Sequence, residues 1–370
     1  MTAQASIQYP RKQLLRASFR FMGRALTALL TRLTITGKEN LPQKGPLIVV
    51  GNHVAMLEAA LMVLYTPWDV ELMAAGEIPL DPRYAPIVNT YGYIPIHRGA
   101  MDRQAMEAAL EVLKQGGVIG MFPEGGIWES AFKRPRTGVS WLSYHAAAPI
   151  LPIGFGGIDG ALAAAMSLKR PRLSMNIGEI MPPVQDEGNK PLKVTLEEGA
   201  RNVMARIESL VPEEDKRRWN RIRDERFELQ LTAFSSGGTP VVIPPELLPP
   251  QPELLSKFFH RPLLLDVMSR NLKLPVEPLQ RLKVEHDPTR LAGACQLALD
   301  YLHQNPHFLT YRFGYDQGNG MKAGLEKLRE ICQWAETYSY QVSVTPIRRY
   351  KRRGNDEEIV EDGPGSLPAL

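Results

Sequence analysis

The chain has 370 residues, of which 44% are hydrophobic and 23% are charged, and its formal net charge at pH 7 is +4. This length allows one large domain and a smaller one, with a sizeable apolar core. The mildly basic balance suits an anionic lipid or a phosphate group as readily as nucleic acid. Nucleic acid is disfavoured, because the sequence has neither an aromatic and basic RNA-binding signature nor a zinc-finger or zipper pattern.

Two further features bear on the cellular compartment. Cys295 and Cys332 lie far apart and lack metal or redox spacing, so we expect ordinary thiols in a reducing compartment. Arginines interrupt the apolar residues near the N-terminus, and we therefore expect no signal peptide.

The first predicted element is an amphipathic helix over residues 11–33, within an N-terminal segment 1–36. Basic residues recur every four positions on one face of this helix, and Leu, Phe and Met lie on the opposite face. The basic residues are Lys12, Arg16, Arg20 and Arg24. Such a helix suits a membrane interface. The alternative is a helix that packs on its own domain and exposes its arginines to water. A membrane-spanning helix is disfavoured, since each arginine at mid-bilayer would cost roughly 2.5–3.5 kcal/mol.

Strand and helix patterns then alternate over residues 37–234. Amphipathic runs predict helices between short apolar runs that predict strands, at 47–51, 70–74, 118–122, 150–155 and 173–180. This order predicts an α/β domain with a central, largely parallel sheet flanked by helices.

The C-terminal third shows three changes of composition. A highly charged run at 213–230 predicts a continuing helix, and the Pro-rich stretch 235–252 predicts a linker. Residues 348–370, with a basic run and then an acidic run, are typical of a disordered tail.

Residues 253–347 predict a second, small α+β domain of unknown role. Within it, the patterns at 307–313 and 340–347 suggest strands on either side of a helix at 320–335.

His53 directly follows the predicted strand 47–51, at the point where a strand gives way to a helix. Reactive groups in α/β folds commonly lie there. His53 and Glu58 are five residues apart, so they can meet only if His53 lies in the loop and the chain bends back toward the first helical turn. In that arrangement Glu58 would accept from one ring nitrogen of His53 and leave the other free to take a proton. On its own, the pair is more simply a helix-capping histidine beside a solvated glutamate.

Three later blocks follow this pair in order. They are Gly92-Tyr93-Ile94-Pro95-Ile96-His97-Arg98, Phe122-Pro123-Glu124-Gly125-Gly126 and Ala148-Pro149-Ile150-Leu151-Pro152-Ile153-Gly154. With Asn52-His53 and Glu58 they resemble the four motifs of the glycerolipid acyltransferase family, typified by 1-acylglycerol-3-phosphate acyltransferase. The resemblance covers roughly residues 35–215.

The resemblance implies a role for each matching residue. His53 is expected to be the general base and Glu58 its carboxylate partner. Arg98, Glu124 and Gly125 are expected to bind the head group of the acceptor. An arginine suits a phosphate because its forked, permanently charged donor can pair with two oxygens, and a glycine lets the backbone approach a ligand closely.

The sequence departs from the family pattern twice. Glu58 stands where aspartate is usual, which moves the carboxylate by roughly an ångström. Gly126-Ile127 replaces the Thr-Arg of the third motif, so a phosphate-binding arginine is missing there. Lys133, a few residues further on and followed by Arg134 and Arg136, is the expected substitute.

The resemblance also implies substrates and a location. Acyl-CoA or acyl carrier protein would supply the acyl group as co-substrate, with no bound cofactor or metal, and a lysophospholipid or related lipid alcohol would accept it. The enzyme would serve phospholipid biosynthesis at the cytoplasmic face of the membrane, as a peripheral or monotopic protein. The alternatives are a non-catalytic lipid-binding protein on the same fold and an acyl-thioester hydrolase.

Overall fold

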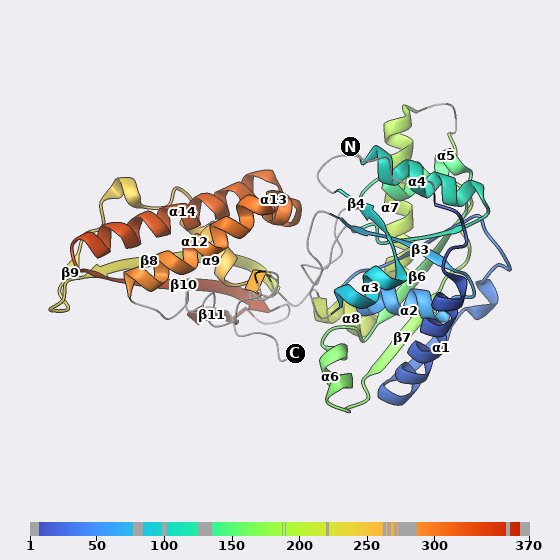
Figure 1. Ribbon diagram of the computed structural model, residues 1–370, viewed down its shortest axis with the longest axis horizontal. Coiled ribbons are helices and arrows are strands. Elements are labelled where there is room, and N and C mark those ends of the chain that lie inside the picture. Colours follow the sequence, from blue (N-terminus) through green and yellow to red (C-terminus); the bar gives the residue numbers. More distant parts are fainter. Residues whose placement is uncertain are drawn as a thin grey trace. The chain divides into compact units, whose positions relative to one another are not determined.

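The computed structural model describes residues 7–76, 84–97, 102–124, 135–186, 188, 190–219, 222–261, 264, 268–269, 272, 287–352 and 356–362 (Figure 1). The chain forms two compact units, and it passes from the first to the second between Asn220 and Arg221. This boundary lies upstream of the predicted linker at 235–252.

The first unit is built on a seven-stranded sheet. Its strands, in spatial order, are β1 (Arg32–Thr36), β7 (Arg172–Ile177), β6 (Ile150–Gly156), β2 (Leu47–Gly51), β5 (Val118–Met121), β3 (Val70–Ala75) and β4 (Ile94–Ile96). Every neighbouring pair is parallel except β6 and β7. The predicted α/β fold with a largely parallel central sheet is therefore confirmed.

Helices cover both faces of this sheet. The unit contains α1 (Gln13–Leu30), α2 (Leu57–Tyr65), α3 (Ala85–Tyr91), α4 (Arg103–Lys114), α5 (Gly138–Ala146), α6 (Ala161–Met166), α7 (Leu192–Leu210), α8 (Glu213–Trp219) and the short 3-10 helix η1 (Lys38–Asn40). Ile48 and Val50 of β2 pack with α4, α5 and α7, whereas Leu47 and Val49 pack with α2 and α6 on the opposite face. Burial on both faces explains why β2 is an unbroken apolar run.

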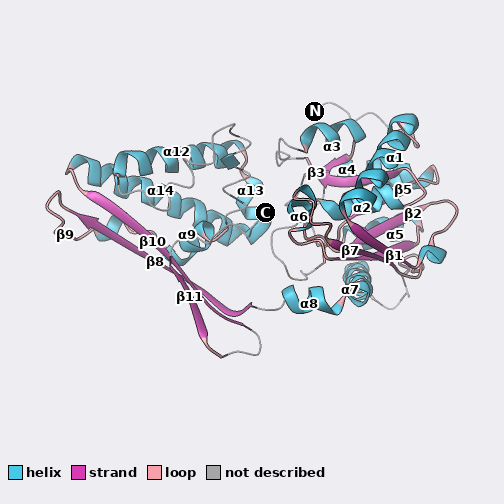
Figure 2. Cartoon of the chain, turned by 90° about the horizontal axis from the view of Figure 1, so that it is seen from below, coloured by secondary structure: helices cyan, strands magenta, loops and turns pink. Residues whose placement is uncertain are grey.

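The second unit is an antiparallel sheet with helices on one side (Figure 2). Its strands, in spatial order, are β11 (Glu358–Asp362), β10 (Gln341–Arg352), β8 (Ile222–Phe234) and β9 (Pro240–Val241). Its described helices are η2 (Pro245–Leu247), α9 (Pro252–Phe259), α12 (Pro288–Gln304), α13 (His307–Phe313) and α14 (Tyr315–Thr337).

Three sequence-based expectations differ from this unit. The predicted helix 213–230 ends at Trp219 and is followed by β8. The predicted strand at 307–313 is the helix α13. The expected tail contains the end of β10 and the whole of β11. The charged residues of β8 alternate with Phe227, Leu229 and Leu231, and pairing with the distant β10 selects the strand.

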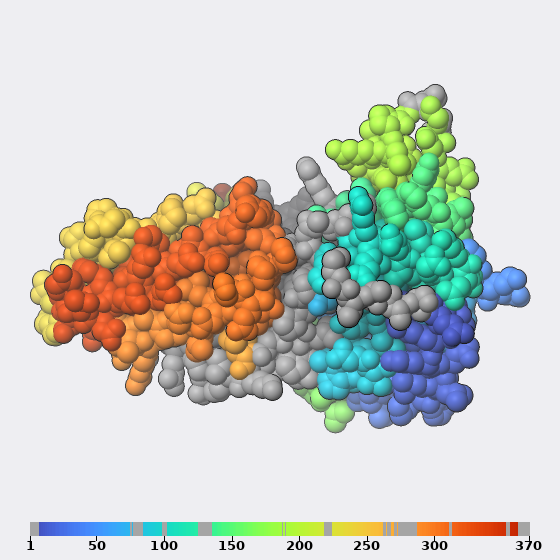
Figure 3. Space-filling view, turned by 45° about the horizontal axis from the view of Figure 1, so that its top comes forward, coloured from blue at the N-terminus to red at the C-terminus, as the bar shows by residue number. Residues whose placement is uncertain are grey.

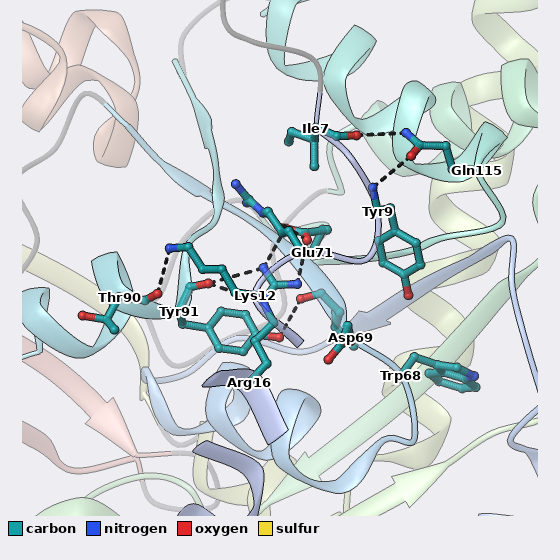
Figure 4. Close-up of polar contacts among 12 residues, drawn as sticks. Ile7, Tyr9, Lys12, Arg16, Trp68, Asp69, Glu71, Thr90, Tyr91 and Gln115 are labelled. Carbon is teal, nitrogen blue, oxygen red and sulfur yellow. Dashed lines mark hydrogen bonds and ion pairs between the residues drawn. The ribbon is translucent and has the colours of Figure 1, made fainter. Parts of the chain in front are cut away.

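Arg16, on the basic face of α1, points into the first unit (Figure 4). Arg16 is completely buried and forms a two-pronged ion pair with Glu71, with N–O distances of 2.6 and 3.0 Å. Arg11 also donates to the Glu71 carboxylate, and the Arg16 guanidinium lies 4.4 Å from the centroid of the Tyr91 ring. Arg20 pairs with Asp69 at 2.6 Å.

The apolar face of α1 consequently points outward. At 100° per residue, six exposed apolar side chains fall within an arc of about 140°. They are Leu14, Leu15, Phe21, Met22, Leu26 and Leu29, and Leu14 is 88% and Phe21 78% exposed. In the space-filling view α1, in dark blue, lies at the surface of its unit (Figure 3). No helix in the described part of the chain is both long and apolar enough to span a bilayer.

Replacement of Glu71 tests whether the buried ion pair holds α1 in this orientation. Glu71→Ala leaves Arg16 buried without its counter-charge, so we expect a loss of about 3–5 kcal/mol in the free energy of unfolding of the first unit. Urea unfolding and hydrogen exchange of the α1 amides measure the effect. Glu179→Ala, which breaks the exposed pair with Arg206, should change stability by less than about 1 kcal/mol. Equal effects of the two variants would contradict the assigned role of Glu71.

Candidate functional site

His53 lies in the loop between β2 and α2, at the carboxyl end of the central strand. The preceding Asn52 is 1% exposed and extends the sheet through its side chain. Its Nδ2 donates to the carbonyl of Phe155 at 3.1 Å, and the Phe155 amide donates to Asn52 Oδ1 at 2.7 Å. The backbone that carries His53 is thereby fixed to the neighbouring strand β6.

The other neighbour of β2 brings Glu124 to the same place. β2 and β5 run parallel in register, with Val50 beside Met121, so the residues that follow the two strands meet at one edge of the sheet. The His53 backbone amide donates to Glu124 Oε1 at 2.9 Å. The His53 and Phe122 rings are stacked, with centroids 4.1 Å apart and planes inclined by 12°. The sheet therefore brings the first and third sequence blocks together.

Glu58, in the first turn of α2, turns back onto the loop that carries His53. Its carboxylate accepts hydrogen bonds from the backbone amides of Val54 and Ala55. This is the bend that a five-residue separation requires, with His53 in the loop and Glu58 in the helix. Glu58 thus holds the two residues that directly follow His53.

Burial controls the ionisation of Glu58. The side chain is fully buried, and this loss of solvation raises its pKa to about 8, against the opposing effect of the backbone hydrogen bonds from Val54 and Ala55. The charge of the nearby Glu124 raises the pKa of Glu58 further. Two acidic groups therefore lie within electrostatic reach of each other beside His53, an arrangement common at functional sites.

The remaining predicted site residues, Arg98, Gly125 and Lys133, lie outside the described residues. The strand that precedes Arg98 ends at Ile96, at the same edge of the sheet and three strand positions from β2. At about 4.8 Å per strand this places the end of β4 roughly 14 Å from the end of β2.

Asp102 is the first described residue after Arg98. Its Oδ2 accepts from the His97 amide at 2.8 Å, and its Oδ1 accepts from the Ala105 amide at 3.0 Å as the N-cap of α4. Burial opposes ionisation, but these hydrogen bonds outweigh it and lower the pKa of Asp102. One carboxylate thus ties the end of β4 to the start of α4.

Arg136 is the described member of the basic group expected to replace the missing arginine. Its backbone amide donates to the carbonyl of Pro123 at 2.9 Å, directly before Glu124, and its side chain is exposed. A cationic side chain therefore begins next to the third block.

The sequence interpretation gave no site role to Asn52, Phe122 or Asp102. Their positions in the sequence could have indicated a role. Asn52 and Phe122 directly follow buried strands, and Asp102 precedes a helix as a typical N-cap. Among the described residues, no group of three or more His, Cys, Asp or Glu side chains is arranged to hold a metal ion.

The pKa of Glu58 predicts a pH-dependent contribution to stability. Folded Glu58 keeps its proton up to about pH 8, whereas an unfolded glutamate loses it near 4.5. Its contribution is therefore complete below the unfolded pKa and is lost as the pH rises through the folded pKa. Between the unfolded pKa of 4.5 and the folded pKa of about 8, the unfolding free energy of the wild type should fall more steeply with pH than that of Glu58→Gln. Urea unfolding at several pH values measures both slopes, and equal slopes would contradict the assignment.

Comparison with known proteins finds related sequences. Residues 32–156 match the family model described as Acyltransferase. The chain is 27% identical over 96 residues to the 1-acyl-sn-glycerol-3-phosphate acyltransferase of Borreliella burgdorferi, covering 25% of this chain and 38% of that protein. It is 21% identical over 165 residues to the enzyme of the same name from Bacillus subtilis, covering 44% of this chain and 81% of that protein.

A solved structure is also similar. The 1-acyl-sn-glycerophosphate acyltransferase PlsC of Thermotoga maritima matches 55% of this chain and 85% of its own, with 18% identity and a TM-score of 0.39. The sequence alignment with the Borreliella enzyme spans about two fifths of that protein's length. The matched family segment runs from β1 to the end of β6 and contains His53, Glu58 and Glu124. Over residues 32–156 the chain is therefore similar to the Acyltransferase family, and both of the relatives named above are 1-acyl-sn-glycerol-3-phosphate acyltransferases.

Proposed function

We propose that the chain transfers a fatty acyl group from the thioester of CoA or acyl carrier protein to the hydroxyl of a lysophospholipid, such as 1-acylglycerol-3-phosphate, or of a related lipid alcohol. The observation that carries this proposal is the convergence of Glu58 and Glu124 on the backbone around His53, at the carboxyl edge of the sheet. Such an arrangement holds an imidazole in place beside two acidic groups.

The proposed reaction needs a base because an alcohol is a poor nucleophile until its proton is removed. His53 would take the proton of the acceptor hydroxyl while the hydroxyl oxygen attacks the thioester carbonyl carbon. A C–O bond forms, the C–S bond breaks, and the imidazolium returns the proton to the departing thiolate. The acceptor oxygen is itself the nucleophile, so no acyl-enzyme intermediate is required.

Glu58 and Glu124 support this cycle in two ways. Each carboxylate accepts from backbone amides at or directly after His53, so together they limit the movement of the imidazole. The negative charge of Glu124, which also raises the pKa of Glu58, favours the imidazolium that forms during proton transfer. Since the His53 amide occupies Oε1 of Glu124, an acceptor hydroxyl would use the remaining capacity of that carboxylate.

We assign recognition of the acceptor head group to the residues that the family resemblance indicates. Arg98, Gly125 and Lys133 keep the roles that the family resemblance gives them. We add Arg136, because its backbone is bonded to Pro123 and its exposed side chain begins beside Glu124. A guanidinium there would replace the one missing after Gly125.

We propose association with the membrane on the basis of the orientation of α1. Its arginines are engaged in ion pairs and hydrogen bonds with its own unit, and its exposed side is apolar. Leu, Phe and Met side chains in this arrangement would insert into the interface of a bilayer. The protein would then meet its lipid acceptor as a peripheral or monotopic enzyme at the cytoplasmic face.

Substitution of His53 tests the proposed base. His53→Ala should lower acyl transfer by about 10²–10⁴-fold, the usual contribution of a general base. Release of free thiol from acyl-CoA and from acyl carrier protein, over a panel of lysolipids and lipid alcohols, measures the rate. The matched control is His145→Ala, which removes an exposed imidazole stacked on Trp141 and should retain activity.

The same assay separates the alternatives. Full turnover by a folded His53→Ala protein would refute the role of His53. Thiol release that needs no acceptor and yields free fatty acid would identify a hydrolase. Lipid binding without thiol release, for every donor and acceptor, would leave only a lipid-binding protein.

Point variants on α1 test membrane association without disturbing the buried ion pair. Phe21→Glu and Leu29→Glu place a charge on side chains that are 78% and 69% exposed, so the fold should be unaffected. Flotation with phospholipid vesicles should fall strongly, because an ionised side chain resists burial in the apolar interface. Unchanged flotation of both folded variants would contradict membrane binding by α1.

A further inference from the structure

The turn after α6 has an unusual residue at a position where glycine is preferred. The Leu168 amide donates to the carbonyl of Ala165, and the Lys169 amide donates to the carbonyl of Ala164, both at 2.9 Å. These two bonds form a Schellman motif, whose C′ residue adopts the left-handed conformation. Leu168 holds that position with φ of 58°, which costs a residue with a Cβ about 1–2 kcal/mol.

The side chain of this strained leucine is not used in the core. Leu168 is 74% exposed, Met166 is also 74% exposed and Leu162 is 38% exposed. An apolar residue in an unfavourable backbone conformation, with its side chain in solvent, gains nothing within the first unit. Local strain of this kind commonly accompanies a functional surface.

This turn is attached to the end of α1. Nη2 of Arg170 donates to the carbonyl of Ala28 at 3.1 Å and to that of Thr31 at 3.4 Å, which satisfies carbonyls at the C-terminus of the helix. Directly afterwards, Arg172 of β7 pairs in register with Arg32 of β1. Figure 1 shows α1 and α6 at the same lower edge of their unit.

Basic residues follow these apolar side chains in the sequence, and another lies on the neighbouring strand β1. Arg32, Lys169 and Arg172 are exposed. The sequence has no acidic residue between Asp159 and Glu179, so the whole segment through α6 and β7 is cationic. Basic side chains beside exposed Leu and Met residues are complementary to a bilayer with anionic head groups.

We propose that the α6–β7 turn is a second membrane contact, which acts together with α1 and selects bilayers that contain anionic phospholipid. Met166 and Leu168 insert into the interface, and Lys169, Arg172 and Arg32 face the phosphate groups. Two contacts joined through Arg170 fix the orientation of the first unit on the bilayer, whereas α1 alone allows rotation about its axis. This inference rests on the membrane association proposed above.

The decisive variant is Leu168→Gly, because it separates folding from binding. Glycine relieves the left-handed strain, so the thermal midpoint should stay equal to that of the wild type or rise. Binding to vesicles should fall about tenfold, on both phosphatidylcholine and phosphatidylcholine–phosphatidylglycerol vesicles, since an inserted leucine is lost. Val242→Gly, which removes an 86% exposed apolar side chain from the second unit, is the control and should bind normally.

A second variant tests the selection of anionic lipid. Lys169→Ser/Arg172→Ser should lower binding to vesicles with phosphatidylglycerol about 20–30-fold, at roughly fivefold per charge, and leave binding to phosphatidylcholine alone unchanged. Arg170 is kept because it caps α1. Equal losses on both vesicle types would overturn the anionic preference.

The remaining outcomes are also decisive. Wild-type binding by Leu168→Gly would overturn the second contact, as would a wild-type protein that fails to float and instead forms dimers that Leu168→Gly disrupts. Flotation does not depend on turnover, so His53→Ala should float like the wild type. The flotation experiment therefore still tests the second membrane contact if the proposed chemistry is wrong.

Discussion

The candidate site depends on backbone amides that donate to two buried carboxyl groups. Glu58 receives the amides of Val54 and Ala55, and Glu124 receives the amide of His53. The loop that carries the imidazole is therefore held from the helix that follows it and from the neighbouring strand. The link from Asn52 to β6 holds the same loop at its start. The motif residues thus determine the position of His53 through the main chain.

This arrangement gives a physical reason for glutamate at position 58, where the motif of the glycerolipid acyltransferase family usually has aspartate. Glu58 begins in the first turn of α2 and reaches back to amides before the helix. The longer side chain suits that reach, and its complete burial raises its pKa to about 8. The substitution is therefore compatible with an ordered site and adds a carboxyl whose charge responds to pH near neutrality and to a cation at His53.

The N-terminal helix reverses a common expectation about amphipathic helices. Its arginines serve the fold, because Arg16 and Arg20 pair with acidic residues of the first unit, while its apolar residues remain outside. Packing is close enough that a side chain at Gly23 would meet Leu64 at 2.4 Å. Ionic docking of a helix leaves its apolar face available to a bilayer, and this links the fold to the proposed location of the protein.

By itself the sequence determined the alternating elements of the first unit, the loop position of His53 and the order of the four blocks, because apolar periodicity and motif spacing are local properties. Tertiary structure decided what depends on partners far along the chain. The charged sequence of β8 predicts a helix, but pairing with β10 makes this segment a strand. Residues 307–313 form a helix packed on α14. The inward direction of the α1 arginines required Glu71 and Asp69, some 50 residues away, which no pattern within the helix could specify.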